Sequence, residues 1–204
     1  MERRRAKTRQ ALLDAGVVVI ADRGIDRLTI ASITDEADVA LGSFYNHFEN
    51  RDDFLRQLSD DAIALWFDDA RRLRPRVPTD QAERMAGACI VVTRRGAADP
   101  VWATFVTESL ARRDIPATAE LRNLLAFGVR AGIDEGTFHC EHVDLVAGMI
   151  LGSIRQVLVQ LADGHAVDEA TTALARTVLG MCGADRDAAA ETVAYLVEHI
   201  AIEI

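Results

Sequence analysis

The sequence predicts an all-α protein of nine or ten helices, and three observations support this fold class. Aromatic residues make up only 5% of the 204 residues, while half of the chain is hydrophobic and Ala, Leu, Val and Ile are plentiful. That composition favours helices over a β-sandwich or barrel. Apolar residues recur at helical spacing between residues that start and stop helices. No stretch alternates convincingly between apolar and polar residues, as a half-buried strand would.

The N-terminal third predicts four helices, each with a recognisable start or end. We expect them over residues 4–23, from Thr29 to about 37, over 41–47 and from Asn50 to about 73. Gly24 stops the first helix. Thr29 and Asn50 can cap the second and fourth helices, because their side chains accept hydrogen bonds from N–H groups of the first turn. Asp38 and Val39 break the chain between the second and third helices.

The remaining helices follow the same punctuation. We expect them from Thr79 to Gly96, from Asp99 to Arg113, from Pro116 to Gly136, over residues 142–163, from Asp168 to Gly183, and from Asp185 or Asp187 to Ile202. Pro100 stands at a first helical position, where its missing N–H is tolerated. Gly164 closes the most apolar helix. The helix over residues 51–73 bridges two parts, so we predict an N-terminal domain at 1–50 and a larger one at 51–204.

Composition excludes several classes of protein. The net charge is −9, which argues against non-specific coating of nucleic acid. No apolar run reaches about 18 residues, so we expect no membrane span, and the basic N-terminus lacks the other features of a secretory signal. Cys89, Cys140 and Cys182 do not form a disulfide framework, which fits a cytoplasmic protein. Lys7 is the only lysine and lacks a neighbouring glycine, so a phosphate-binding Gly-Lys loop is impossible.

Nothing in the sequence indicates an enzyme. No Gly-x-Ser-x-Gly elbow and no Gly-x-Gly-x-x-Gly after a strand is present. Acidic pairs such as Asp60-Asp61 are sequential neighbours, which do not face each other on a helix. His139, Cys140 and His142 have metal-ligand chemistry, but neighbouring residues cannot all reach one ion, and a connecting loop explains them better. We therefore expect no cofactor and no metal.

The segment from Thr29 to Phe54 carries the most specific pattern. Two short helices separated by about three residues are the geometry of a helix-turn-helix. Five apolar residues can pack inward: Ile33, Ala37, Val39, Phe44 and Phe48. The outward set consists of small and hydrogen-bonding side chains, which suit contacts with base edges and phosphates: Leu41, Gly42, Ser43, Tyr45, Asn46 and His47. An ordinary helical hairpin would share the spacing.

Residues 8–58 add a longer pattern: Leu12-Leu13-Asp14-Ala15 with Gly24, Thr29 and Ile33, Val39, Gly42-Ser43-Phe44-Tyr45, His47-Phe48 and Arg51-Asp52. This pattern resembles the TetR family of transcriptional repressors. The resemblance covers about a quarter of the chain, and beyond residue 58 only the length and the helical rhythm agree. It implies a homodimer that binds palindromic operator DNA and is released by a small-molecule effector. With two-fold symmetry, half-site centres should lie ~34 Å or slightly more apart.

The predicted DNA-contacting residues lie on the second to fourth helices and at the N-terminus. They are Arg4, Arg5, Thr29, Ser32, Leu41, Gly42, Ser43, Tyr45, Asn46, His47 and Arg51. Residues 1–10 hold five bases and one acid, so they form either a flexible arm on DNA or a solvated terminus. Residues 1–58 hold nine bases and ten acids, whereas residues 59–204 hold fourteen and twenty-two. We therefore expect DNA contact at the N-terminal domain only.

Five positions depart from the family pattern. Arg51 replaces a more common lysine and can still contact a phosphate group. Ala40 stands where a capping residue is common, so the recognition helix should lack a side-chain cap. Asp38 replaces a turn glycine, but aspartate tolerates the left-handed conformation. Gly16 replaces an alanine inside the first helix, at a cost of ~1 kcal/mol. Leu41 replaces a polar base reader and can contact a thymine methyl group instead.

The C-terminal helices supply candidates for an effector cavity and for a dimer interface. The effector candidates are apolar, which predicts a largely apolar ligand: Trp66, Met85, Cys89, Trp102, Phe105, Phe127 and Met149. The dimer candidates are two glycines one helical turn apart and two apolar stripes: Gly148, Gly152, Leu174, Val178, Leu196 and Ile200. Packing inside one subunit is the alternative for each of these residues.

Two other functions remain open at this stage. An all-α enzyme or small-molecule carrier could use the C-terminal pocket without binding DNA. A helical interaction module could bind another protein. Activation rather than repression of transcription is also compatible with the sequence.

Overall fold

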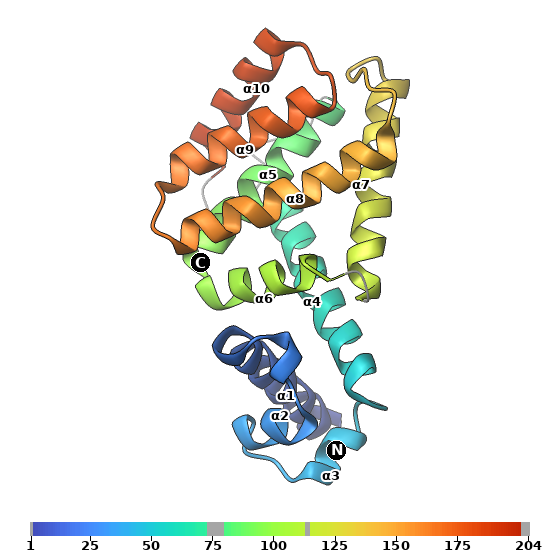
Figure 1. The fold of residues 1–204 in the computed structure, drawn as a ribbon, viewed down its shortest axis with the longest axis vertical. Coiled ribbons are helices and arrows are strands. Elements are labelled where there is room, and N and C mark those ends of the chain that lie inside the picture. Colours follow the sequence, from blue (N-terminus) through green and yellow to red (C-terminus); the bar gives the residue numbers. More distant parts are fainter. Residues whose placement is uncertain (1, 73–79, 113–114, 201–204) are drawn as a thin grey trace.

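The computed structural model describes residues 2–72, 80–112 and 115–200, which form ten α-helices and one short 3-10 helix. These residues contain no strand, so the predicted all-α fold class and the predicted number of helices are confirmed. A small group of N-terminal helices lies at one end of an elongated molecule, and a larger helical bundle lies at the other (Figure 1). Helix α4 (Arg51–Arg72) runs between the two groups.

We call the N-terminal group the head and the larger bundle the body. The head contains α1 (Glu2–Arg23), η1 (Ile25–Arg27), α2 (Ile30–Glu36) and α3 (Leu41–Tyr45). The body contains α5 (Gln81–Ala98), α6 (Pro100–Leu110), α7 (Pro116–Asp134), α8 (Val143–Ala162), α9 (Val167–Met181) and α10 (Arg186–His199). Helix α5 packs against α8, α9 and α10, so it lies at the centre of the body.

Most of the predicted helix caps are confirmed. The side chains of Thr29, Asn50, Asp99 and Asp185 accept hydrogen bonds from N–H groups in the first turns of α2, α4, α6 and α10. Asp168 does not cap α9, because that helix begins earlier, with Ala166 as its N-cap residue. The sequence gives no signal for the true start of α9, because the side chain of Ala166 cannot accept a hydrogen bond.

Four predicted helix ends lie outside the described residues. They are the ends near Leu73, Thr79, Arg113 and Ile202. Within the described part of the chain, Asp80 caps α5 by accepting a hydrogen bond from the N–H of Glu83 at 2.9 Å.

Three phenylalanines form the centre of the head. The ring centroids of Phe44 and Phe48 lie 5.2 Å apart, and Phe54 of α4 lies 4.9 Å from Phe48 and 5.6 Å from Phe44. Phe54 also packs against α1 at Gly16, where a Cβ atom would come within 2.4 Å of its ring. Glycine at this position therefore permits a close approach of α4 to α1. The first turns of α4 pack with the head, so we propose that the division between the two domains falls within α4. The boundary after residue 50 stays a prediction.

Helix α6 connects the body to the head. It packs against α1 and against η1. Arg112, just after α6, forms an ion pair with Asp26 of η1. Displacement of α6 would therefore be transmitted to α1 and η1, while α4 continues from one part of the molecule into the other.

Helix α8 is the most apolar helix. Among the described residues, it is the one helix long and apolar enough to cross a membrane by length and composition, with a mean hydropathy of 1.6, so the expectation that no such segment exists was wrong. In the structure, one face of α8 packs into the body through Val146, Ile150 and Ile154, and the helix contacts α5, α6, α7 and α9. Its apolar character thus comes partly from core packing and partly from an exposed face.

The histidine- and cysteine-containing segment lies between α7 and α8. The backbone N–H of His139 donates to the carbonyl oxygen of Cys182 at 2.9 Å, and His142 is the N-cap residue of α8. In the part of the chain that the structure describes, no group of three His, Cys, Asp or Glu side chains could hold a metal ion.

Candidate nucleic-acid interface and effector cavity

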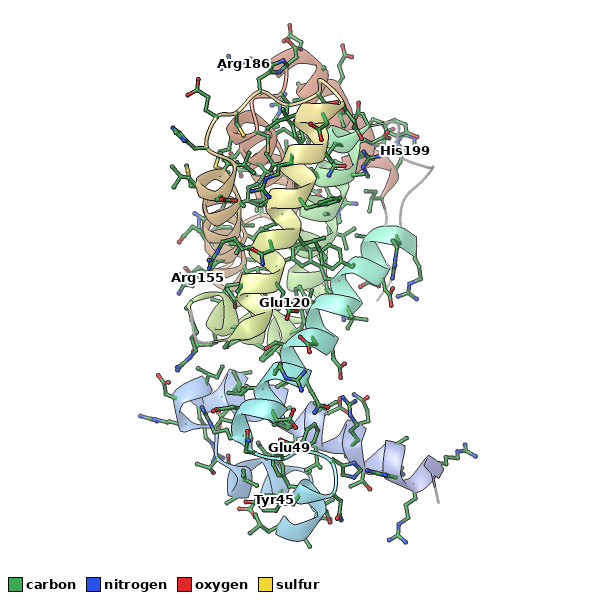
Figure 2. All side chains as sticks on the ribbon, turned by 90° about the vertical axis from the view of Figure 1, so that its right-hand side faces the viewer. Tyr45, Glu49, Glu120, Arg155, Arg186 and His199 are labelled. Carbon is green, nitrogen blue, oxygen red and sulfur yellow. The ribbon has the colours of Figure 1, made fainter. Side chains whose placement is uncertain are left out.

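Helices α2 and α3 form the helix-turn-helix at the far end of the head. Residues 37–40 connect them, and Asp38 has a φ of 52°, the left-handed conformation expected for the turn. Ala40 provides no side-chain cap to α3, as the sequence indicates. Figure 2 shows Tyr45 at the end of the molecule opposite Arg186 of α10. The exposed surface of α3 therefore lies at the opposite end of the molecule from α10 of the acidic body (Figure 2).

The exposed side chains of α3 are those predicted to face DNA. Leu41 is 53% exposed and Tyr45 is 57% exposed, whereas Phe44 between them is fully buried. Gly42 and Asn46 are exposed, and Ser43 and His47 are half-buried. A Cβ atom added to Gly42 would meet no other atom within 4 Å. Helix α3 thus presents one continuous surface of small and hydrogen-bonding groups, while Phe44 fixes it to the head.

Thr29 and Ser32 have a structural role at the start of α2. The side chain of Thr29 accepts from the N–H of Ser32, and the side chain of Ser32 accepts from the N–H of Thr29, both at 3.0 Å. This capping box satisfies two N–H groups that have no partner within the helix. Contact of either residue with DNA stays a prediction.

Arg51, which is predicted to contact DNA, forms hydrogen bonds inside the head. Its Nε donates to the carbonyl oxygen of Leu28 at 2.8 Å, and its Nη2 donates to that of Ile25 at 2.6 Å. The guanidinium group therefore holds the segment between η1 and α2 against the start of α4. These bonds give Arg51 a structural role inside the head, and its contact with phosphate stays a prediction.

The basic N-terminus is helical. Helix α1 begins at Glu2, so Arg4 and Arg5 belong to a helix and not to an extended arm. Figure 2 shows the first turns of α1 extending beyond the other helices of the head. Arg5 donates to the carbonyl oxygen of Asn46 at 3.1 Å, which joins α1 to the end of α3. Arg5 thus brings positive charge to the end of α3 from a helix.

The environment of His47 keeps its imidazole uncharged near neutral pH. Partial burial, followed by the positive charges of Arg5 and Arg9, lowers the pKa of His47 below its ordinary value of 6.5. Each of these causes disfavours the protonated form. A nearby phosphate group would act in the opposite direction.

A small cavity lies between α4, α6 and α7, where the body meets α4. Three of the seven predicted effector residues line it: Trp66, Trp102 and Phe105. Its volume is about 20 Å³. That is enough for about one water molecule. A larger ligand would have to separate the surrounding helices.

Four predicted effector residues lie elsewhere. Met85 and Cys89 are buried in the core of the body and do not line this cavity. Burial raises the pKa of the Cys89 thiol to about 12, so the thiol stays protonated. Phe127 and Met149 point to solvent, with 68% and 49% of their surfaces exposed. The helical spacing of the apolar residues therefore did not predict which face of each helix is buried.

The dimer candidates also divide into two groups. Gly148 and Gly152 lie exposed on α8, with no atom within 4 Å of an added Cβ. The apolar stripes of α9 and α10 are fully used inside one subunit, because Leu174, Val178, Leu196 and Ile200 are at most 2% exposed. These four residues belong to the core formed by α5, α9 and α10, which favours the alternative of packing inside one subunit.

Sequence reasoning missed the hydroxyl groups of the cavity. Ser59 of α4 and Ser109 of α6 line it together with Thr118 of α7. The signal was present in the sequence, since each serine interrupts the apolar face of a helix. A single hydroxyl group on such a face is common, however, and only the fold brings the two serines to one cavity.

Both parts of the chain match known families. Residues 12–58 match the family described as bacterial regulatory proteins, tetR family. Residues 80–195 match the family described as tetracyclin repressor-like, C-terminal domain. The first match runs from within α1 to the first turns of α4, and the second covers the body from α5 into α10. Both families consist of regulators, not enzymes.

Individual relatives are similar over shorter segments. The HTH-type transcriptional repressor DhaR of Mycobacterium sp. (strain GP1) is 37% identical over 68 residues, which are 33% of this chain and 32% of that protein. The probable acrEF/envCD operon repressor of Escherichia coli (strain K12) is 35% identical over 52 residues, 26% of this chain and 24% of that protein. This chain thus matches a third or less of the length of these relatives.

The similarity in fold covers nearly the whole chain. The crystal structure of RolR in complex with resorcinol has a TM-score of 0.66 and 24% sequence identity, and the alignment covers 95% of this chain and 96% of that chain. At this identity, the similarity supports the arrangement of helices and no particular ligand.

Proposed function

Because this chain belongs to the TetR family of bacterial regulatory proteins, we propose that it is a transcriptional repressor. In this proposal it binds palindromic operator DNA as a homodimer and releases the DNA when a small-molecule effector occupies the body. The observation that carries the proposal is the α3 surface: Leu41, Tyr45 and Asn46 are exposed at the tip of the head on a helix anchored by the buried Phe44. Such a helix can enter the major groove and reach base edges.

The distribution of charge supports contact through the head alone. Arg4 and Arg5 lie on the first turns of α1, and Arg5 reaches the end of α3. Residues 59–204 carry a net charge of −8 (fourteen bases and twenty-two acids), which phosphates would repel. A cytoplasmic location fits a regulator of this kind.

The proposal can be tested by selecting DNA from a random-sequence pool with the purified protein. We expect enrichment of a single sequence with two inverted half-sites, because a two-fold symmetric protein reads a two-fold symmetric site. If the pool contains no enriched sequence after repeated rounds, the head is not a sequence-specific DNA reader. Transcription from a promoter that contains the enriched site then distinguishes repression from activation.

We further propose that the exposed apolar surface of α7 and α8 is the dimer interface. Phe127 and Leu145 are 68% and 63% exposed, and Leu124 and Met149 are also exposed. An ion pair between Arg130 and Asp144, with 2.7 Å between Nη2 and Oδ1, joins the two helices beside these side chains. Large exposed apolar side chains grouped on one face are typical of interaction sites.

The two glycines of α8 support a second copy of this chain as the occupant. Gly148 and Gly152 lie on the exposed face of α8, and neither has an atom near its missing side chain. Small residues one turn apart let two helices approach closely. On a two-fold axis, each α8 can pack against its own copy, so the same surface completes both halves of the interface.

Replacing Phe127 by glutamate should therefore weaken the dimer. The substitution occurs twice across the two-fold axis and introduces an unpaired charge into an apolar contact, so we expect the dissociation constant to rise by at least about 30-fold. Sedimentation velocity across a dilution series measures this constant. Val18→Glu is the matched control, because Val18 is an exposed apolar residue of α1, in the head and outside the proposed interface. A wild-type monomer at every concentration, or an unchanged dimer in the Phe127 variant, would contradict this interface.

DNA binding should strengthen as the pH falls below about 7. The pKa of His47 is lowered in the free protein, whereas phosphates beside α3 would raise it in the complex. The complex would then take up a proton, and affinity would increase with falling pH between these two pKa values, by up to about tenfold per pH unit for each head. Anisotropy titrations of wild type and His47→Gln over this pH range measure the difference. An identical pH dependence in the variant would show that His47 does not face the DNA.

A further inference from the structure

The cavity between α4, α6 and α7 has an unusual set of polar groups. Two polar groups of lining residues have hydrogen-bond partners. Nε1 of Trp66 donates to the backbone carbonyl oxygen of Ala88 at 3.1 Å, and the hydroxyl of Thr118 donates to the backbone carbonyl oxygen of Ser109 at 3.1 Å. Three others, Oγ of Ser59, Oγ of Ser109 and Nε1 of Trp102, are buried and have no hydrogen-bond partner among the described residues.

Unpartnered buried groups in one small space point to a ligand. The three residues are 2%, 7% and 5% exposed, respectively. Leaving a buried polar group without a hydrogen bond costs about 1–3 kcal/mol, and most such groups in folded proteins have partners. All three belong to residues that line this cavity, so a guest molecule that separates these side chains could form hydrogen bonds with them.

The chemistry of the lining restricts the guest. The side chains that line the cavity are apolar or carry hydroxyl or indole N–H groups, and none of them is charged. A charged molecule would lose its hydration without gaining a counter-charge, because the nearby cation Arg95, which lies over the ring of Trp102, is already paired with Asp69. The indole N–H can only donate, so the guest must offer an acceptor oxygen or nitrogen, whereas each serine can donate or accept.

We propose that this cavity binds an uncharged ring compound that carries a hydroxyl or carbonyl group, and that this compound is the effector class of the protein. The aromatic side chains of Trp66, Trp102 and Phe105 supply the flat apolar walls. This inference rests on the proposed function, because it names the ligand class of the body in a ligand-released repressor.

Because the cavity is small, binding of a ligand requires movement of the side chains that line it. A ring compound does not fit into about 20 Å³, so its entry must displace the lining side chains. Ala62, Trp102 and Phe105 also line a second pocket of about 270 Å³, which lies between α1, α4 and α6. Open space thus lies beside Trp102 and Phe105 on the side of the head, into which a ligand could displace them. A ligand that binds only the opened form shifts the equilibrium toward that form.

The two tryptophans of the chain provide a direct readout. Both line the cavity, and each gives one indole N–H resonance in a ¹H–¹⁵N spectrum. We expect phenol at millimolar concentration to shift the resonance of Trp102, which is identified by its loss in Trp102→Phe. Benzoate has the same ring with a negative charge and should bind at least about tenfold more weakly.

A double variant tests the two serines. Ser59→Ala with Ser109→Ala should weaken phenol binding by about tenfold in calorimetry, and should leave binding of toluene, which has no polar group, unchanged. Because both hydroxyls lack partners, the variant should be at least as stable to urea as wild type. Thr171→Val is the matched control, since its buried hydroxyl already donates to the carbonyl oxygen of Val167 and lies on α9.

The outcomes separate this inference from the proposed function. If phenol shifts neither indole resonance, if benzoate binds as tightly as phenol, or if the double variant binds phenol like wild type, the proposed ligand class is wrong. Each of these results leaves repression intact when the protein still binds its selected DNA. Loss of sequence-specific DNA binding in the wild type, with phenol bound as expected, would instead refute the repressor and retain a cavity for neutral ring compounds.

Discussion

Replacing Gly42 by glutamate should abolish specific DNA binding without damaging the fold. A side chain at this position meets no atom within 4 Å. It would stand on the exposed surface of α3, where its carboxylate would face phosphates and base edges. We expect a loss of at least about tenfold per head, and therefore of about 100-fold or more for a dimer. Anisotropy on the selected operator measures the loss.

The same substitution should slightly stabilise the head. Glycine is the less favourable residue inside a helix by about 1 kcal/mol, and a carboxylate in the first turn interacts favourably with the helix dipole. Gly180→Glu adds the same charge at an exposed, unobstructed position of α9 and should leave DNA binding unchanged. Equal affinities of wild type and Gly42→Glu for the operator would mean that α3 does not contact DNA.

Replacing Arg95 by alanine should produce the largest loss of stability. The side chains of Arg95 and Asp69 are only 11% and 8% exposed, and they form an ion pair between α5 and α4. The guanidinium group also lies over the ring of Trp102, 5.3 Å from its centroid. Removing Arg95 leaves the buried carboxylate of Asp69 with Arg72, whose side chain is largely exposed. We expect a loss of about 3 kcal/mol in the free energy of unfolding.

A double-mutant cycle in urea isolates this pair. Its members are wild type, Arg95→Met, Asp69→Leu and the double variant, in which both charges are removed. Each single variant leaves one buried charge without its partner, so the double variant should lose clearly less stability than the sum of the two single losses. If Arg95→Ala unfolds at the urea concentration of wild type, the pair does not hold α4 to α5.

Local signals in the sequence predicted the starts of several helices well. Thr29, Asn50 and Asp99 have short side chains that satisfy the first N–H groups of a helix, and all three act as caps. The left-handed Asp38 and the uncapped α3 also follow from the identity of a single residue. These features depend on neighbours within about four positions, which the sequence contains in full.

Features that depend on distant neighbours were not predictable in this way. Arg51 reaches carbonyl groups 23 and 26 residues earlier in the chain, and no local pattern distinguishes this role from a phosphate contact. Gly16 carries a helix-propensity cost in the sequence, but the fold uses it to admit the ring of Phe54. The partners of a long side chain, and the positions at which two helices approach closely, depend on which helices pack together.

The apolar helices of the body show the same limit more strongly. The pair Leu174 and Val178 on α9 and the pair Leu145 and Met149 on α8 have the same spacing of four residues, yet the first pair is buried and the second is exposed. Periodicity identifies a face, but it does not state which helix, subunit or ligand covers that face. The unpartnered hydroxyls of the cavity depend in addition on the packing of three helices.

The central claim is that α3 reads a specific DNA sequence, and fluorescence anisotropy of wild-type protein tests it most directly. The labelled duplexes are the operator obtained by selection and a scrambled duplex of equal length, titrated across a salt series. We predict saturable binding to the operator, with the scrambled duplex at least ~10³-fold weaker near physiological salt. Equal affinity for both duplexes, falling together as salt rises, would contradict the claim and leave only charge attraction between the basic N-terminus and phosphates.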